Sequence, residues 1–139
     1  MAHTPFTCEI LTPEGEVFND EVTMVSTRTT VGSIGILARH QPLLGMLEPT
    51  ELRLYRGESG VLRFAQGEGY VQVAGDHVLI LVEEAQRPEE LDAAELRARI
   101  ERADRELASA GEDSEQARLA ARDKRRAEAF LKIAEGASA

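Results

Sequence analysis

The residues most often used for catalysis or metal binding are few and widely spaced in this chain. His3, His40 and His77 are its histidines and Cys8 its one cysteine, and no histidine has a second His or Cys at metal-ligand spacing. The sequence contains neither a Gly-x-Ser-x-Gly elbow nor a Gly-Lys-Ser/Thr phosphate loop. We therefore expect no catalytic site, no metal and no cofactor, and the pattern favours a binding or coupling protein over an enzyme.

Composition narrows the classes of partner. The 25 acidic and 16 basic residues give a formal net charge of -9. This charge argues against nucleic-acid binding, which depends on neutralising phosphates, and against direct docking on an anionic membrane surface. The strongest apolar run, residues 78–82, is far shorter than the ~20 residues of a membrane-spanning helix. We expect any association with a membrane to be indirect, through a partner protein.

The first 87 residues show the alternation that is typical of half-buried β-strands. The alternating apolar residues are Phe6, Cys8 and Ile10, Val22 and Met24, Leu52 and Leu54, Leu62 and Phe64, and Val71 and Val73. Turn-forming residues separate these runs, and we interpret the glycine-rich segments 32–35 and 67–69 as turns. Short strands with no helical pattern between them suggest a sandwich or a barrel, and of the two we predict an antiparallel β-sandwich over residues 1–87.

The pattern changes to a helical one after residue 88. Ala, Glu, Arg and Leu dominate from residue 91 onward, and all of them favour helices. We predict two helices, at about residues 92–109 and 113–134, that form an antiparallel two-helix hairpin. Residues 88–139 would then be a second domain.

Particular residues are expected to begin and end these helices. Asp92 is the predicted N-cap of the first helix, with Glu95 completing a capping box. Gly111 is the predicted left-handed residue at the break, and Asp113 is the predicted N-cap of the second helix. The two helices carry few large apolar side chains, so we expect the hairpin to need a docking surface and to act as a movable element.

The second helix is basic although the protein is acidic. Residues 116–133 contain six basic and two acidic side chains. One interpretation is an acidic partner surface. The other is a solvated helix face whose cations are favoured near the helix C-terminus.

The order of all these segments resembles the epsilon subunit of bacterial F-type ATP synthase over nearly the whole chain. The similar pieces are Glu-Ile-Leu-Thr-Pro-Glu-Gly at 9–15, Gly-Ser-Ile-Gly-Ile-Leu-Ala-Arg-His-Gln-Pro-Leu at 32–43, the strands at 67–73 and 78–82, and the alanine-rich helical pair. Two departures occur. Ala38-Arg39 stands where the family usually has Pro-Gly, and Glu68-Gly69 stands where it commonly has Gly-Gly.

The resemblance implies a non-catalytic subunit of the central stalk. Such a subunit turns with the rotor and couples proton-driven rotation of the c ring to ATP synthesis. Its implied partners are the gamma subunit, the c ring and the alpha/beta catalytic hexamer, and its implied location is peripheral, at the cytoplasmic face of the cell membrane. The implied interface with the c ring and gamma consists of Ser33, Ile34, Arg39, His40, Gln41 and Pro42. We hypothesise that Arg39 pairs with acidic loop residues of the c subunits.

The resemblance also implies regulation by the hairpin, which in this family lies folded on the sandwich or extends along gamma and blocks ATP hydrolysis. The cationic residues that would meet an acidic segment of a beta subunit are Arg118, Arg122, Arg125 and Arg126. The alternative that the sequence leaves open is a stand-alone β-sandwich binding module with a helical tail.

Some family members bind ATP on the folded hairpin through an Ile/Leu-Asp-x-x-Arg-Ala motif and through arginines on the second helix, one of which Arg126 matches. This chain keeps Leu91-Asp92, but Glu95 occupies the position of the motif arginine. Asp92 and Arg126 are the residues that match, and a carboxylate at position 95 should repel a triphosphate. We therefore disfavour ATP as a regulatory ligand, because helix capping already explains Asp92 and Glu95.

Overall fold

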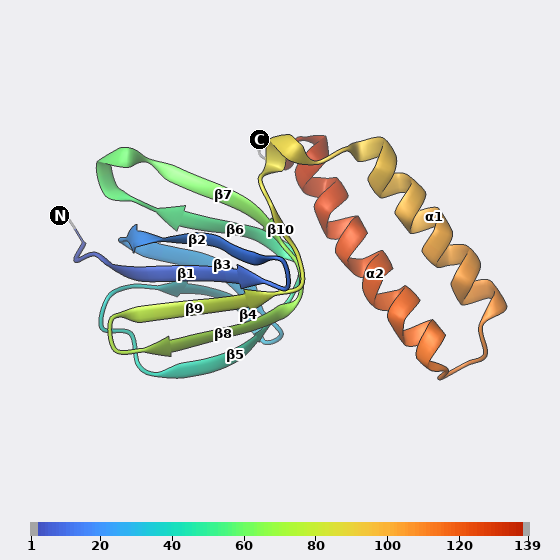
Figure 1. Ribbon diagram of the computed structural model, residues 1–139, viewed down its shortest axis with the longest axis horizontal. Coiled ribbons are helices and arrows are strands. Elements are labelled where there is room, and N and C mark those ends of the chain that lie inside the picture. Colours follow the sequence, from blue (N-terminus) through green and yellow to red (C-terminus); the bar gives the residue numbers. More distant parts are fainter. Residues whose placement is uncertain (1–2, 138–139) are drawn as a thin grey trace. The chain divides into compact units, whose positions relative to one another are not determined.

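The computed structural model describes residues 3–137 of the chain. The chain divides into two compact units, Met1–Arg87 and Pro88–Ala139. The first unit is made of β-strands and the second of helices (Figure 1). Each unit has its own core and is described separately.

The first unit contains ten strands that follow the chain in short hairpins. They are β1 (Phe6–Thr12), β2 (Gly15–Val22), β3 (Met24–Thr29), β4 (Gly32–Ile36), β5 (Leu43–Leu47), β6 (Thr50–Tyr55), β7 (Val61–Gln66), β8 (Gly69–Ala74), β9 (His77–Val82) and β10 (Ala85–Gln86). The strands are ordered β10-β7-β6-β3-β5-β8-β9-β1-β2, and β4 pairs with β3. Figure 1 shows this sheet folded over on itself into two layers, which confirms the predicted sandwich. The pair β1–β9 is parallel, whereas the prediction was fully antiparallel.

The core of the sandwich follows the alternation in the sequence. Phe6, Cys8 and Ile10 on β1 are at most 3% exposed, and Val71 on β8 and Ile80 on β9 are fully buried. Burying one such large apolar side chain stabilises a fold by about 1.5–3 kcal/mol. These side chains come from strands far apart in the sequence, so the unit is held together by long-range packing.

The alternation in the sequence predicted one strand at a place where the structure has the end of one strand and the start of another. Val22 and Met24 were predicted to lie on one strand, but β2 ends at Val22 and β3 begins at Met24. Thr23 breaks the strand because both its backbone N–H and its hydroxyl donate to the Tyr55 carbonyl, at 2.6 and 3.1 Å. Val25, rather than Met24, is therefore the buried apolar residue of β3.

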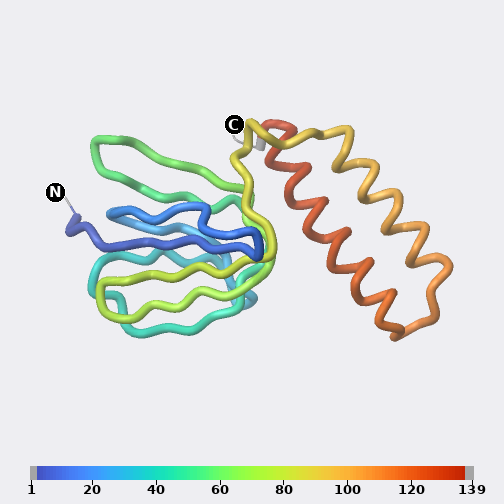
Figure 2. The backbone as a smooth tube through the Cα atoms, viewed as in Figure 1, coloured from blue at the N-terminus to red at the C-terminus, as the bar shows by residue number. Residues whose placement is uncertain are grey.

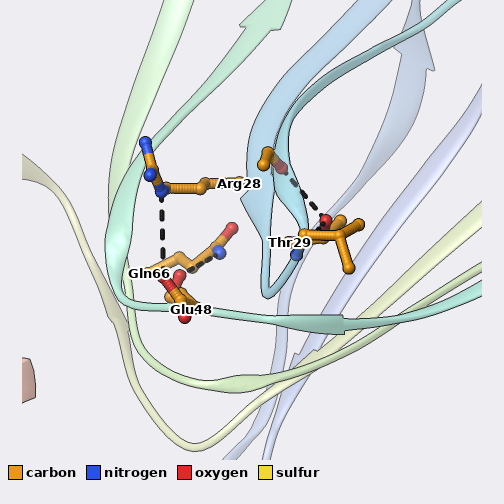
Figure 3. Close-up of polar contacts among 6 residues, drawn as sticks. Arg28, Thr29, Glu48 and Gln66 are labelled. Atoms are coloured by element: carbon orange, nitrogen blue, oxygen red, sulfur yellow. Dashed lines mark hydrogen bonds and ion pairs between the residues drawn. The ribbon is translucent and has the colours of Figure 1, made fainter.

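One polar side chain is fully buried within the sandwich. Gln66 accepts a hydrogen bond from the Thr27 hydroxyl at 2.7 Å, and its amide nitrogen donates to the Glu48 carbonyl at 2.9 Å. Figure 3 shows the amide of Gln66 turned toward Glu48. Because a buried amide without partners would destabilise the fold, these two bonds fix the β5–β6 turn against β7.

The second unit is an antiparallel pair of helices (Figure 2), as the sequence predicted. Helix α1 is Ala93–Ser109 and α2 is Glu115–Lys132, preceded by a short 3-10 turn at Pro88–Glu90 and followed by a π-type turn at Ile133–Ala137. The Asp92 carboxylate accepts hydrogen bonds from the backbone N–H groups of Ala94 and Glu95, at 3.0 and 3.3 Å. The N-cap prediction for α1 is confirmed.

The predicted cap of the second helix was wrong by one residue. The Ser114 hydroxyl accepts from the Ala117 N–H at 3.1 Å, so Ser114 is the N-cap of α2. Asp113 instead takes a left-handed backbone conformation, with φ of 60°. Gly111 is not among the residues of positive φ. Ser114 therefore takes the capping role expected of Asp113, and Asp113 takes the left-handed conformation expected of Gly111, which a short Asp side chain tolerates.

The seam between the helices is narrow and contains small side chains. The buried residues are Leu96 and Ala103 on α1 and Ala120, Ala127 and Phe130 on α2. Ion pairs flank this seam.

The interhelical ion pairs alternate in direction. Arg99 on α1 donates to Asp123 on α2 at 2.9 Å, and Lys124 on α2 lies 2.7 Å from Asp104 on α1. The hydrogen bond to Asp104 raises the pKa of Lys124. Arg97 pairs with Glu135 beyond the end of α2. The hairpin therefore depends on charge pairing where the sandwich depends on large aliphatic side chains.

Candidate interaction surfaces

The turn between β3 and β4 presents an apolar side chain to solvent. Val31 is 95% exposed. Its backbone N–H donates to the Thr29 hydroxyl at 3.2 Å, and that hydroxyl donates to the Gly32 carbonyl at 3.0 Å. The Thr30 N–H donates to the Met46 carbonyl, which ties the turn to β5. The turn is fixed by its own hydrogen bonds, so Val31 is held outward in a defined position.

The predicted interface residues do not come together in one place. Ser33 is exposed and Ile34 packs partly on the core, and both lie on β4 near the Val31 turn. The glycine-rich segment 32–35, interpreted from the sequence as a turn, is therefore most of a strand. The remaining predicted residues follow Ile36, the last residue of β4, and so lie beyond the opposite end of this strand. The three residues from Ser33 to Ile36 alone span about 10 Å.

Those remaining residues are Arg39, His40, Gln41 and Pro42. Arg39, Gln41 and Pro42 are exposed and His40 is half-buried, with its Nδ1 2.7 Å from the Gln41 carbonyl. Pro42 lines an open hollow together with Leu43, Leu44 and Gln72. This segment is therefore continuous with the outer surface of β5 and β8 rather than with the Val31 turn.

Four exposed apolar side chains lie on the outside of β5, β8 and β9. Leu44, Met46, Tyr70 and Leu81, which we call the apolar face, are 73%, 55%, 52% and 43% exposed. Met46 pairs with Tyr70, Tyr70 with Leu81, and Leu81 with Leu11 on β1, so three of the four residues form a continuous row across adjacent strands. A second open hollow, of about 300 Å³, includes Leu11, Tyr70 and Leu81 in its lining. Contiguous exposed apolar side chains mark interaction surfaces.

Sequence reasoning missed both the Val31 turn and the apolar face. A signal for the face was present in apolar neighbours such as Leu43-Leu44, Met46-Leu47 and Ile80-Leu81. Successive residues of a strand point to opposite faces, so one member of each pair has to lie outside the core. Val31 had a weaker signal, an apolar residue between two threonines and a glycine.

The four predicted arginines of α2 lie mostly away from α1. Arg118, Arg122 and Arg125 are exposed, and Arg126 is half-buried. The first three have the i, i+4, i+7 spacing of one helix face. Ala120 and Ala127, which are buried, occupy the opposite face. Arg118 and Arg125 are thus exposed on the side of α2 opposite its buried alanines.

No feature of the described residues suggests reaction chemistry. Burial, followed by the neighbouring Glu9 carboxylate, raises the pKa of the Cys8 thiol to about 12, so this cysteine stays protonated and unreactive. No group of three or more His, Cys, Asp or Glu side chains within residues 3–137 is arranged to hold a metal ion. The functional features of the described residues are therefore the exposed surfaces set out above.

Comparison with known proteins identifies the family. Residues 5–88 match the family described as ATP synthase, Delta/Epsilon chain, beta-sandwich domain. The ATP synthase epsilon chain of Halalkalibacterium halodurans is 37% identical over 125 residues, covering 90% of this chain and 93% of that one. That of Rubrobacter xylanophilus is 34% identical over 116 residues, covering 84% and 79%. The chain belongs to the ATP synthase epsilon chain family.

The fold of this epsilon chain family member is also found in solved assemblies. A chain of the Euglena gracilis mitochondrial ATP synthase, in a structure of OSCP, F1 and the c ring, superposes with a TM-score of 0.68 at 22% identity. The match covers 96% of this chain and 79% of that one. At this identity the likeness supports the fold. None of the helices within residues 3–137 is long and apolar enough to span a membrane.

The first departure from the family pattern has a structural explanation. The His40 N–H donates to the Leu37 carbonyl at 3.2 Å, and Arg39, the third residue of this turn, has φ of 65°. A type II turn favours Pro at its second position and Gly at its third, where φ is positive. The family's Pro-Gly therefore suits the turn that Ala38-Arg39 forms here, and Arg39 adopts a conformation that costs a non-glycine residue energy.

The second departure leaves the essential residue in place. A Cβ on Gly69 would lie 1.9 Å from the Leu81 carbonyl oxygen and 2.7 Å from the Val82 Cα. Backbone atoms have little freedom to move away, so this position excludes a side chain. Glu68, the residue that differs from the family's Gly-Gly, lies in the connection just before β8.

Proposed function

We propose that this chain is the non-catalytic rotor subunit of the central stalk of an F-type ATP synthase, coupling proton-driven rotation of the c ring to ATP synthesis. The apolar face is the observation that carries this proposal. A well-packed sandwich has no need of exposed Leu44, Met46, Tyr70 and Leu81, and covering them requires a partner protein. The epsilon chain relatives supply the assembly in which such a partner exists.

The surfaces are assigned to two rotor partners. The apolar face is broad and fits one large subunit, gamma. The segment from Arg39 to Pro42 joins it through the hollow that contains Pro42 and Leu44. The Val31 turn, with Ser33 and Ile34, is narrow and fits the short loops of the c ring. This assignment moves the hypothesised Arg39 contact from the c ring to gamma, because Arg39 lies at the far end of β4 from the Val31 turn.

Binding to purified gamma subunit and c ring tests this assignment. A Leu44→Glu, Tyr70→Glu double variant should weaken gamma binding about a hundredfold, because two central apolar contacts are lost and two charges are buried. Val31→Glu should weaken c-ring binding and leave gamma binding unchanged. Leu119→Glu, at an exposed leucine of the hairpin, is the matched control. Unchanged gamma affinity of the double variant would contradict the role of the apolar face.

The hairpin is assigned an inhibitory role. We infer that residues 1–87 and 88–139 are functional domains, and that the hairpin blocks ATP hydrolysis when Arg118, Arg122, Arg125 and Arg126 meet an acidic segment of a beta subunit. Two features support this. The hairpin is a compact unit separate from the sandwich, and its seam is formed mostly by small side chains and ion pairs, so it opens at modest cost.

Hydrolysis by the assembled enzyme tests the inhibitory role. A chain ending at Arg87, assembled into the enzyme in place of the full chain, should still support coupling. It should raise ATP hydrolysis severalfold relative to the full chain. Arg118→Gln, Arg122→Gln and Arg125→Gln combined should raise hydrolysis in the same direction, and Arg102→Gln, on an exposed position of α1, should not. Equal hydrolysis with the truncated and full chains would show that the hairpin is not inhibitory. We further propose that the subunit is peripheral, at the cytoplasmic face of the membrane, and is held there by the c ring.

A further inference from the structure

The outer surface of β6 and β7 carries two arginines directly opposite each other. Arg53 on β6 pairs in register with Arg63 on β7. Leu52 and Leu54, the neighbours of Arg53 in the chain, are fully buried, so Arg53 points away from the core. The side chains of Arg53 and Arg63 are 43% and 44% exposed. Like charges directly opposite on neighbouring strands destabilise a sheet, so this pair needs a negative charge nearby.

The sandwich supplies one carboxylate for the two arginines. Arg53 donates through Nε to Oε1 of Glu51 at 2.6 Å, and Nε of Arg63 lies 4.0 Å from the same oxygen. Hydrogen bonds to Glu51 and then to Tyr55 raise the pKa of Arg53. The Glu51 side chain is only 12% exposed and lies two residues from Arg53 on β6, on the same face of the sheet. One negative charge against two positive ones leaves the cluster with a net positive charge.

The geometry leaves the outer end of the Arg63 guanidinium group available, whereas Arg53 also hydrogen-bonds Tyr55. Each arginine approaches Glu51 through Nε, which is the inner nitrogen of the guanidinium group. Within the part of the chain that the structure describes, no protein acceptor contacts the terminal Nη amines of Arg63. A guanidinium anchored in this way is preorganised, and two of them side by side suit the two oxygens of a carboxylate or phosphate.

An apolar row lies next to the arginines on the same outer surface. Tyr55 of β6 pairs with Met24 of β3 on one side and with Val61 of β7 on the other. Tyr55 and Val61 are two residues from Arg53 and Arg63, and therefore face the same way. Val61 is 42% exposed. Arginine, tyrosine and methionine are the side chains enriched at the centres of protein interfaces.

We propose that Arg53 and Arg63 form a clamp for a carboxylate of a protein partner, whose neighbouring apolar side chain packs on Met24, Tyr55 and Val61. The apolar row favours a protein segment over an inorganic anion. Charge favours it too, because residues 1–87 carry a net charge of -6 that repels a multiply charged phosphate more strongly than a single carboxylate. The clamp lies on β3, β6 and β7, whereas the apolar face lies on β5, β8 and β9, so the clamp stands or falls independently of the proposed gamma contact.

The test uses full-length protein and two matched synthetic peptides, acetyl-Gly-Leu-Glu-Leu-Gly-amide and its Gln counterpart. NMR titration at low salt should show that the Glu peptide shifts the Nε–Hε signals of Arg53 and Arg63 and the backbone signal of Tyr55. The Gln peptide should bind at least about tenfold more weakly, because it lacks the charge that strengthens a hydrogen bond to arginine. Inorganic phosphate is the third probe, and should bind more weakly than the Glu peptide.

Variants separate the clamp from a general effect of charge. An Arg53→Lys, Arg63→Lys double variant keeps the net charge but loses the forked geometry, and should reduce affinity for the Glu peptide about tenfold. Arg102→Lys, at an exposed position of α1 outside the clamp, should leave the affinity for the Glu peptide unchanged. Equal binding of the Glu and Gln peptides, or unshifted Arg53 and Arg63 signals in the wild-type protein, would overturn the clamp. Tighter binding of phosphate than of the Glu peptide would overturn the assignment to a protein partner.

Discussion

The sandwich and the hairpin are stabilised by different kinds of interaction. The sandwich buries large side chains such as Ile10, Ile80 and Leu54 that are contributed by distant strands. The hairpin brings together neighbouring helices whose seam contains Ala103, Ala120 and Ala127. Hydrophobic burial resists salt, whereas exposed ion pairs are screened by it. The difference gives one unit held by hydrophobic burial and one unit whose stability should depend on ionic strength.

Gly69→Ala should produce the largest effect and should act on the sandwich. The new Cβ would overlap the Leu81 carbonyl oxygen and crowd Val82, which forces β8 and β9 apart. We expect a loss of more than about 4 kcal/mol in the free energy of unfolding, the range of severe steric or packing defects. Urea unfolding followed by tyrosine fluorescence measures it, because Tyr55 and Tyr70, the only tyrosines, are both in the sandwich.

Gly45→Ala is the matched control for this prediction. A Cβ at Gly45 would meet Val71 and Thr29 at ordinary contact distances of 3.6 and 3.7 Å. We expect its unfolding free energy to change by less than about 1 kcal/mol. If both variants lost the same stability, the close approach at Gly69 would not be the cause.

Ionic strength should produce an intermediate effect that is confined to the hairpin. Each exposed ion pair contributes about 0.2–1 kcal/mol, and the screening length falls from about 10 Å at 0.1 M salt to about 3 Å at 1 M. We expect the thermal midpoint of helix loss, followed by circular dichroism, to fall by about 5 °C over this range. The tyrosine signal of the sandwich should keep its midpoint.

Removing the charges should remove most of this salt dependence. A variant with Arg99→Gln, Asp123→Asn, Asp104→Asn and Lys124→Gln deletes both central pairs and keeps the Arg97–Glu135 pair, so its helices should lose most of the wild-type salt response. Glu101→Gln, at an exposed position of α1, is the control and should retain the wild-type response. A salt response undiminished by the fourfold substitution would mean that the central ion pairs do not stabilise the hairpin.

The sequence was sufficient for the fold class because alternation and helical composition are local signals. It failed where a local signal is ambiguous. The pattern at Val22 and Met24 does not show that Thr23 will bond to Tyr55, and that contact ends β2. Asp113 and Ser114 are both competent caps, and the left-handed backbone at Asp113 decides between them.

The interaction surfaces were harder to predict because they depend on strand register. Met46, Tyr70 and Leu81 form a row only through the pairing of β5, β8 and β9. In the same way, Arg53 and Arg63 are ten residues apart in the chain and become neighbours through the pairing of β6 with β7. A slip of one residue in either pairing would turn these side chains to the other face.

The smallest expected effect concerns the turn that ends at His40. Arg39→Gly relieves a left-handed conformation that costs a non-glycine residue roughly 1–2 kcal/mol. Glycine also makes the unfolded chain more flexible, and this added entropy stabilises the unfolded state by about 0.4–1 kcal/mol. We expect a net gain of up to about 1 kcal/mol in the free energy of unfolding of the sandwich. Adding Ala38→Pro, which suits the second position of a type II turn, should increase the gain. Arg39→Ala keeps the strain and should give no gain, so stabilisation by Arg39→Ala equal to that by Arg39→Gly would show that loss of the arginine side chain, and not relief of the backbone, is responsible.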